Sequence, residues 1–114
     1  MPFINSKVSV KITEEQETEL KSRLGQAISL IPGKSESWLM TGFEDNYHLY
    51  FKGDNSEPTA FVEVSVYGNP DPDGFSKLTA EIFKIFGEVL GITANRIYVK
   101  YSATTDWGWN GSNF

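Results

Sequence analysis

The chemistry that this chain could perform depends first on its second residue, a proline that directly follows the initiator methionine. Removal of Met1 would turn the nitrogen of Pro2 into a free secondary amine. An α-amino group titrates at about pH 8 in water, and burial beside apolar groups or cations lowers its pKa. Such an amine can act as a base at cellular pH. The dipeptide alone also fits any protein that begins with Met-Pro, and a retained Met1 would make the nitrogen a non-basic amide.

Few other side chains in the sequence offer catalytic or metal chemistry. The chain has no cysteine, which excludes disulfides, thiolate nucleophiles and zinc-thiolate sites. Its single histidine, His48, has no second histidine with which to share a metal or complete a triad. Because His48 lies in an alternating run from Tyr47 to Phe51, we expect it on the face of a strand, without a catalytic role.

Charged clusters in the sequence are better explained by local structure than by a site. The pair Glu14-Glu15 begins a predicted helix, where carboxylates complement the helix dipole, and Asp71 and Asp73 lie in a turn-rich loop. The fragment Gly33-Lys34-Ser35 lacks the upstream glycine of a phosphate-binding P-loop. We therefore expect no metal site and no cofactor.

Length and charge restrict the class of protein. A chain of 114 residues is close to the commonest size of one domain, so residues 1–114 are expected to form a single domain. The net charge of -5, without a basic stripe interleaved with aromatic residues, argues against nucleic acid as a partner. No signal peptide and no apolar run of about 20 residues is present, so we expect a cytoplasmic protein without a membrane partner.

The first half of the chain has the pattern of strand, helix and strand. Thr13 and Gln16 form a Thr-x-x-Gln capping box, which begins a helix. Apolar residues then recur at three- and four-residue spacings from Leu20 to Ile31, which places them on one helix face. The predicted segments are a strand over residues 3–10, a helix that stops at Pro32-Gly33, a strand over residues 37–43, a short strand over residues 47–51 and a turn over residues 53–55.

The second half repeats this order. A strand is predicted over residues 60–67, a loop over residues 68–74, a helix whose apolar face runs from Leu78 to Val89, and a strand over residues 97–101. The order of strand, crossover helix and parallel strand occurs twice in the chain. This repetition predicts an α+β fold. The expected architecture is a tandem β-α-β repeat with a four-stranded mixed sheet, two helices on one face and short extra strands.

That architecture leaves the other sheet face uncovered. Eight phenylalanines, five tyrosines and three tryptophans are many for a chain of this size, and several must lie on that face or at chain ends. An exposed apolar sheet face normally indicates assembly. The tail over residues 107–114 is aromatic but too rich in glycine for a helix, so we expect it to pack against a neighbouring subunit or to line a pocket.

Five short motifs, spread over the whole chain, occur together in one known family. They are Met1-Pro2, Pro32-Gly33-Lys34, Ser56-Glu57-Pro58, Asn95-Arg96-Ile97-Tyr98 and Trp109-Asn110-Gly111-Ser112. In this order the chain resembles the macrophage migration inhibitory factor family of the tautomerase superfamily. The resemblance implies β-α-β repeats assembled as a homotrimer, with an amino-terminal proline as the catalytic base.

The resemblance also implies roles for two residues near the predicted base. Pro2 would move a proton between the carbon beside a keto group and the enol oxygen of an aromatic 2-keto acid such as phenylpyruvate. Lys34 would hold the substrate carboxylate and lower the pKa of the amine by like-charge repulsion. Without the resemblance, Lys34 is better explained as a cation at the C-terminus of a helix.

The walls of the implied pocket come from six further residues. Tyr67 stands where the family usually has an isoleucine whose backbone N–H binds the substrate carboxylate. Tyr98 matches a tyrosine contributed by an adjacent subunit, although a buried strand tyrosine is an equal alternative. Two residues depart from the family: Lys100 replaces a common asparagine, and Trp107 replaces a smaller aliphatic residue. The remaining two, Trp109 and Phe114, match aromatic wall residues.

Three functions remain open at this point. The first is a cofactor-independent phenylpyruvate tautomerase, and the second is a cytokine-like protein that binds a cell-surface receptor, is released by a non-classical route and keeps only a vestigial pocket. The third, dehalogenation or decarboxylation of an unsaturated acid, typically needs arginines beside the proline, whereas Arg23 and Arg96 fall on a helix and at the start of a strand. The oxidoreductase activity linked to a Cys-x-x-Cys pair in the family is not transferred, because the chain has no cysteine.

Overall fold

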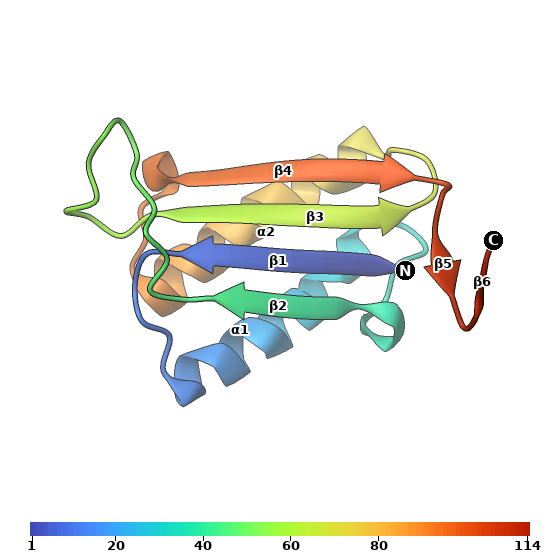
Figure 1. The fold of residues 1–114 in the computed structure, drawn as a ribbon, viewed down its shortest axis with the longest axis horizontal. Helices are drawn as coiled ribbons and strands as arrows, with labels where there is room; N and C mark the ends of the chain where they lie inside the picture. The colour runs from blue at the N-terminus through green and yellow to red at the C-terminus, as the bar shows by residue number, and fades with distance from the viewer.

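A single mixed sheet organises the computed structural model, which describes residues 1–114 (Figure 1). Its strand order is β2-β1-β3-β4, with β1 parallel to β2, antiparallel to β3, and β3 parallel to β4. The α+β fold with a four-stranded mixed sheet is therefore confirmed. The strands are β1 (Pro2–Val8), β2 (Met40–Glu44), β3 (Ala60–Tyr67) and β4 (Ile97–Thr104).

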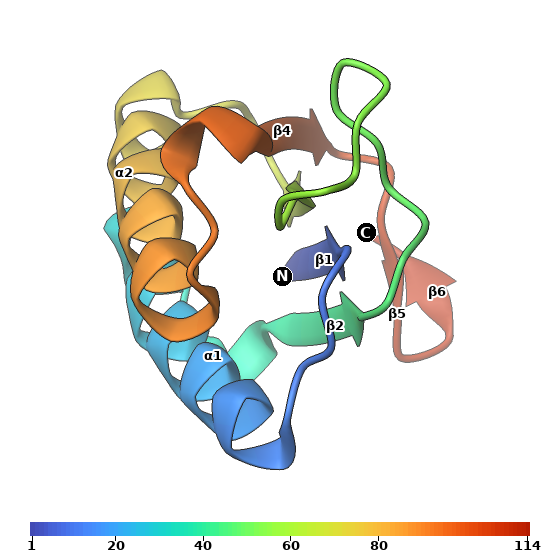
Figure 2. The ribbon, with the colours of Figure 1, turned by 90° about the vertical axis from the view of Figure 1, so that its left-hand side faces the viewer.

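Two long helices cover the same face of this sheet, as Figure 2 shows. Helix α1 (Glu14–Ala27) begins with the predicted capping box, because the Thr13 side chain accepts from Gln16 N–H while the Gln16 side chain accepts from Thr13 N–H. Helix α2 (Pro72–Leu90) is capped at its N-terminus by Asp71, whose carboxylate accepts from Gly74 N–H. The short elements are η1 (Ile28–Leu30), η2 (Glu36–Trp38), η3 (Ala94–Arg96), β5 (Gly108–Trp109) and β6 (Ser112–Asn113).

The core lies between the sheet and the two helices. Burial alternates along β1, where Pro2, Ile4, Ser6 and Val8 face the helices, and the same alternation holds along β3. Leucine, isoleucine and phenylalanine side chains of α1 and α2 complete this apolar layer. No helix combines the length and the hydrophobicity that crossing a bilayer requires.

The opposite face of the sheet has no helix over it and is polar along its middle. Lys7 lies 3.6 Å from the Glu63 carboxylate, and the Asn5 amide donates to the Glu44 carboxylate at 3.0 Å. Several aromatic residues lie on this face, as expected, and its large apolar side chains gather at its two ends. They are Phe3, Met40 and Tyr67 at one end and Phe61 and Tyr98 at the other.

The predicted strand over residues 47–51 is wrong. Strand β2 ends at Glu44, and the only pairing near this segment is an isolated bridge between Phe51 and Asp54. Positive φ angles at Asn46 and Lys52 interrupt the extended backbone on both sides. The expectation for His48 is wrong for the same reason, since this residue is exposed in a loop rather than on the face of a strand.

The boundaries of two further elements differ from the sequence prediction. The strand predicted over residues 37–43 begins only at Met40, because residues 36–38 form the short helix η2. The last strand continues to Thr104 rather than ending at residue 101, because its pairing with β3 runs to the end of β3 at Tyr67. Both changes bring aromatic residues to the same end of the sheet.

The Ser6 side chain gives a test of the core. Ser6 is fully buried and its hydroxyl has no hydrogen-bond partner. An unpaired buried hydroxyl costs about 1–3 kcal/mol, so Ser6→Ala should leave the free energy of unfolding unchanged or raise it by about 1 kcal/mol. Urea unfolding measures this, with Ser102→Ala on the exposed side of β4 as the control. A loss of stability specific to Ser6→Ala would contradict this description of the core.

Candidate active site

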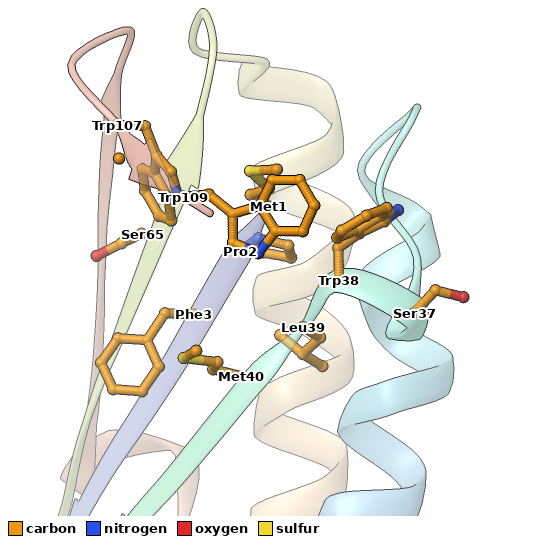
Figure 3. A pocket seen from close by; sticks show the side chains of 11 residues that line it. Met1, Pro2, Phe3, Ser37, Trp38, Leu39, Met40, Ser65, Trp107 and Trp109 are labelled. Atoms are coloured by element: carbon orange, nitrogen blue, oxygen red, sulfur yellow. The ribbon is translucent and has the colours of Figure 1, made fainter. Parts of the chain in front are cut away.

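A cavity of about 720 Å³ opens at the end of the sheet where the chain begins (Figure 3). The register places this end: Phe3 pairs with Met40 at the start of β2 and with Ser65 near the end of β3. The C-terminal hairpin β5–β6 lies at the same end, as Figure 1 shows. The lining consists of Met1, Pro2, Phe3, Ser37, Trp38, Leu39, Met40, Ser65, Trp107, Gly108 and Trp109.

The predicted base, Pro2, lies in the lining of this cavity and is buried. Met1 is still attached to it in this chain, so the terminal amine belongs to Met1. Burial first, and then the nearby Lys34 ammonium, lower the pKa of that α-amino group below its ordinary value of 8.0. The environment at this position therefore disfavours a charged terminal amine.

The Lys34 side chain reaches the end of β3. The chain turns at Gly33, whose φ of 82° is a left-handed conformation that suits glycine, and Lys34 N–H donates to the Ile31 carbonyl at 3.1 Å. The Lys34 ammonium then donates to the Tyr67 carbonyl oxygen at 2.7 Å. The Tyr67 N–H in turn donates to the Met1 carbonyl. Hydrogen bonds therefore link Lys34, Tyr67 and Met1.

Five aromatic rings form a continuous chain of edge contacts around the cavity. The Tyr67 ring lies 6.5 Å from that of Trp107 and 5.1 Å from that of Phe114. Phe114 lies 6.4 Å from Trp109, which lies 5.2 Å from Trp38 at an interplanar angle of 90°. Edge-to-face contacts of this kind are favourable because the positive rim of one ring meets the negative face of the next.

The C-terminal tail lies along this cavity as a tight hairpin. Its turn is formed by Asn110 and Gly111, both with positive φ, and Asn-Gly is the preferred pair for such a turn. Phe114 N–H donates to the Trp107 carbonyl at 3.1 Å, which closes the hairpin. The expectation that the tail lines a pocket is therefore confirmed within the chain itself.

Two of the predicted site residues lie away from Pro2. Tyr98 pairs with Phe61 and Pro2 pairs with Val66, so the two are separated by about 17 Å along the sheet. Tyr98 is 60% exposed and lines a second, smaller cavity of about 190 Å³. Lys100 is exposed and pairs with Glu63 in the middle of the uncovered face. A single chain does not bring these residues to the base.

The structure adds site residues that the sequence reasoning missed. They come from η2 and the start of β2: Trp38, Leu39 and Met40 line the cavity, and 72% of Met40 and 52% of Trp38 are exposed. Phe3 and Ser65 also belong to the lining. A tryptophan in the otherwise polar run of residues 35–38 was the one available signal, but its place depends on how β2 pairs with β1.

Comparison with known proteins gives the family of this chain. A family model described as macrophage migration inhibitory factor (MIF) matches residues 1–114. The chain belongs to the MIF family. Its fold is that of the tautomerase superfamily, and together these findings support a tautomerase or MIF-like function. A search of curated protein sequences gave no match.

Solved structures agree with membership of the MIF family. Leishmania major MIF2 is 35% identical with a TM-score of 0.91, covering 100% of this chain and 97% of that protein. A MIF homologue from Prochlorococcus marinus is 32% identical with a TM-score of 0.85, covering 98% of each chain. A protein described as inactivated by 2-oxo-3-pentynoate has a TM-score of 0.85 at 16% identity, over 97% of this chain and 94% of that one, and this likeness shows the fold alone.

The effect of Lys34 on the terminal amine can be measured. In the chain that retains Met1, Lys34→Ala should raise the pKa of the α-amino group towards 8.0, because a neighbouring positive charge is removed. Burial, the larger cause, remains, so the pKa should stay below 8.0. NMR titration of the chain with ¹⁵N-labelled methionine gives the value. Lys34→Arg keeps the cation as a control, and an alanine variant with the parent pKa would contradict the assignment.

Proposed function

We propose that the chain, once Met1 is removed, is a cofactor-independent keto-enol tautomerase for aromatic 2-keto acids such as phenylpyruvate. The observation that carries this proposal is the position of Pro2, buried in a mostly hydrophobic cavity that three tryptophans help to line, within the influence of the Lys34 ammonium. A secondary amine in these surroundings is disfavoured in its charged form, so it is available as a base near neutral pH.

The proton transfer follows from this arrangement. The Pro2 nitrogen takes a proton from the benzylic carbon of the keto form and delivers it to the carbonyl oxygen, while the electron pair of the broken C–H bond forms the carbon–carbon double bond of the enol. The Tyr67 N–H donates to the terminal residue and the Lys34 ammonium acts on its amine, so both groups are suited to hold the substrate carboxylate and to offset the developing enolate charge. Pro2 is the base and these two groups are the anion binders.

The aromatic side chains account for the class of substrate. Trp38, Trp107 and Trp109 line the cavity, and Phe114 lies against Trp109. Such faces and edges accept an aromatic ring and exclude water from the reacting carbon. In another protein of the same fold, 2-oxo-3-pentynoate, itself a 2-keto acid, is described as an inactivator. The anion binders and the aromatic wall support an aromatic 2-keto acid here.

A homotrimer is part of the proposal because the site is incomplete in one chain. Tyr98 lies near the far end of β4 from Pro2 and Lys100 lies in the middle of this strand, and large apolar side chains are exposed at both ends of the sheet. A head-to-tail ring of three chains would bring the Tyr98 end of one chain against the Pro2 end of the next. Tyr98 would then complete the pocket wall, and Lys100 would add a positive charge where the family commonly has an asparagine.

A second candidate function is a cytokine-like signalling role through a cell-surface receptor. Membership of the MIF family favours it. In that case the surface of the assembly, rather than the cavity, would carry the function, and the cavity would be vestigial. The two candidates are separated by whether the cavity turns over a keto acid at all.

The role of Pro2 can be tested directly. Pro2→Gly replaces the secondary amine by a more mobile primary amine, so phenylpyruvate tautomerisation should fall by about 100-fold or more relative to the processed parent chain. Ultraviolet absorbance of the enol measures the rate, and intact mass confirms the loss of Met1 in both chains. Pro70→Gly, in an exposed loop, is the matched control and should keep parent activity. Inactivity of the parent itself would favour the signalling role.

A site shared between subunits can be tested by mixing two inactive variants. Pro2→Gly lacks the secondary amine and Tyr98→Ala lacks the wall residue, yet each chain carries the group that the other has lost. After joint unfolding and reassembly, mixed trimers should contain some intact sites and show more activity than the sum of the separate variants. Sedimentation should give three times the chain mass of 12.8 kDa. A monomer, or a mixture without gain, would contradict the shared site.

A further inference from the structure

Met1 does more in this structure than cap the nitrogen of Pro2. Its carbonyl oxygen accepts a hydrogen bond from Tyr67 N–H at 3.1 Å, and its half-buried side chain lines the main cavity. The Met1 carbonyl therefore uses the Tyr67 N–H, a backbone donor that the proposed ligand would need. The Met1 side chain takes up part of the space in the cavity that the ligand would need.

The peptide group that follows Tyr67 is held by two hydrogen bonds of its own. The Tyr67 carbonyl accepts from the Lys34 ammonium at 2.7 Å, and the next residue, Gly68, donates to the Thr104 carbonyl at 2.8 Å. Both contacts are made by the single peptide group between Tyr67 and Gly68, and they hold it at the end of β3. The Tyr67 N–H belongs to the preceding peptide group, inside β3, and meets the carbonyl of Met1, a residue of the cavity lining.

We propose that Met1 is a built-in inhibitor of ligand binding: its carbonyl fills the position of the substrate carboxylate at Tyr67 N–H, so its removal opens the binding position as well as freeing the base. This inference rests on the proposed function, since it concerns the same site. Removal is hydrolysis by an aminopeptidase, in which water adds across the Met1–Pro2 bond, methionine leaves and the Pro2 nitrogen gains a hydrogen.

The physical reason is the state of the donors after methionine has gone. Tyr67 N–H loses its acceptor beside an ammonium group and aromatic walls, and an unpaired donor in such a place is unfavourable. An N–H beside a cation attracts an anion, because both groups can bind a carboxylate with charge-assisted hydrogen bonds. The processed chain should therefore bind aromatic carboxylates, whereas the unprocessed chain should not.

Three forms of the otherwise unchanged chain test this inference. The first begins at Pro2; the second retains Met1; the third carries Met1→Gly, which keeps the carbonyl but lacks the side chain. The last two are released from a cleavable amino-terminal fusion after purification, so that no cellular aminopeptidase acts on them. The probe is 3-phenylpropionate, which has a ring and a carboxylate but no keto group, and ¹H–¹⁵N NMR follows its binding and the Tyr67 amide.

The Pro2 form should bind 3-phenylpropionate at least about tenfold more tightly than either of the other two forms, with a shift of the Tyr67 amide signal. Without ligand, the Tyr67 amide should exchange with solvent faster in the Pro2 form than in the Met1 form. Equal affinities, equal exchange rates, or tight binding by the Met1→Gly form would each overturn the inference. Binding limited to the Pro2 form, without turnover of phenylpyruvate, would instead uphold the inference and reject the proposed function.

Discussion

The register of one strand is the constraint on which the rest of this structure depends. Strand β1 pairs in parallel with β2 and antiparallel with β3, so its first residues lie between the beginning of one strand and the end of the other. The backbone hydrogen bonds of two ladders hold this position. A shift of β1 by one residue would turn Ile4 and Val8 out of the core, and it would move Pro2 out of the cavity lining.

The placement of the first residues of β1 determines the chemistry of the cavity, because the terminal amine there is both desolvated and close to a fixed charge. A terminal amine beside aromatic walls loses hydration, and the Lys34 ammonium adds repulsion, so both effects disfavour its charged form. Lys34 is itself held by the carbonyl of Tyr67, whose N–H faces the terminal residue. The end of β3 thus orients a cation and a backbone donor towards the same point, where an anionic ligand would be stabilised.

The uncovered sheet face combines polar pairs along its middle with apolar side chains at its ends. The Lys7–Glu63 and Asn5–Glu44 contacts satisfy charged and polar groups without a covering layer. The apolar ends are different, since Tyr98 and Met40 leave most of their surface exposed. This division fits contacts made end to end between copies, because burial of the two ends would remove apolar surface from water while the middle could stay hydrated.

The sequence by itself determined the order of the major elements, the helix start at Thr13 and the apolar faces, because these depend on local periodicity, capping and turn chemistry. It misled at residues 47–51, where alternating aromatics pack at the end of the sheet instead of pairing as a strand: the Phe51 ring meets that of Tyr98, and the Lys7 ammonium lies over Tyr47. Only the tertiary structure decided that Trp38 and Met40 line the cavity, that Lys34 binds the Tyr67 carbonyl and that Tyr98 lies far from Pro2. These facts depend on strand register and on contacts between residues distant in the chain, which no local pattern encodes.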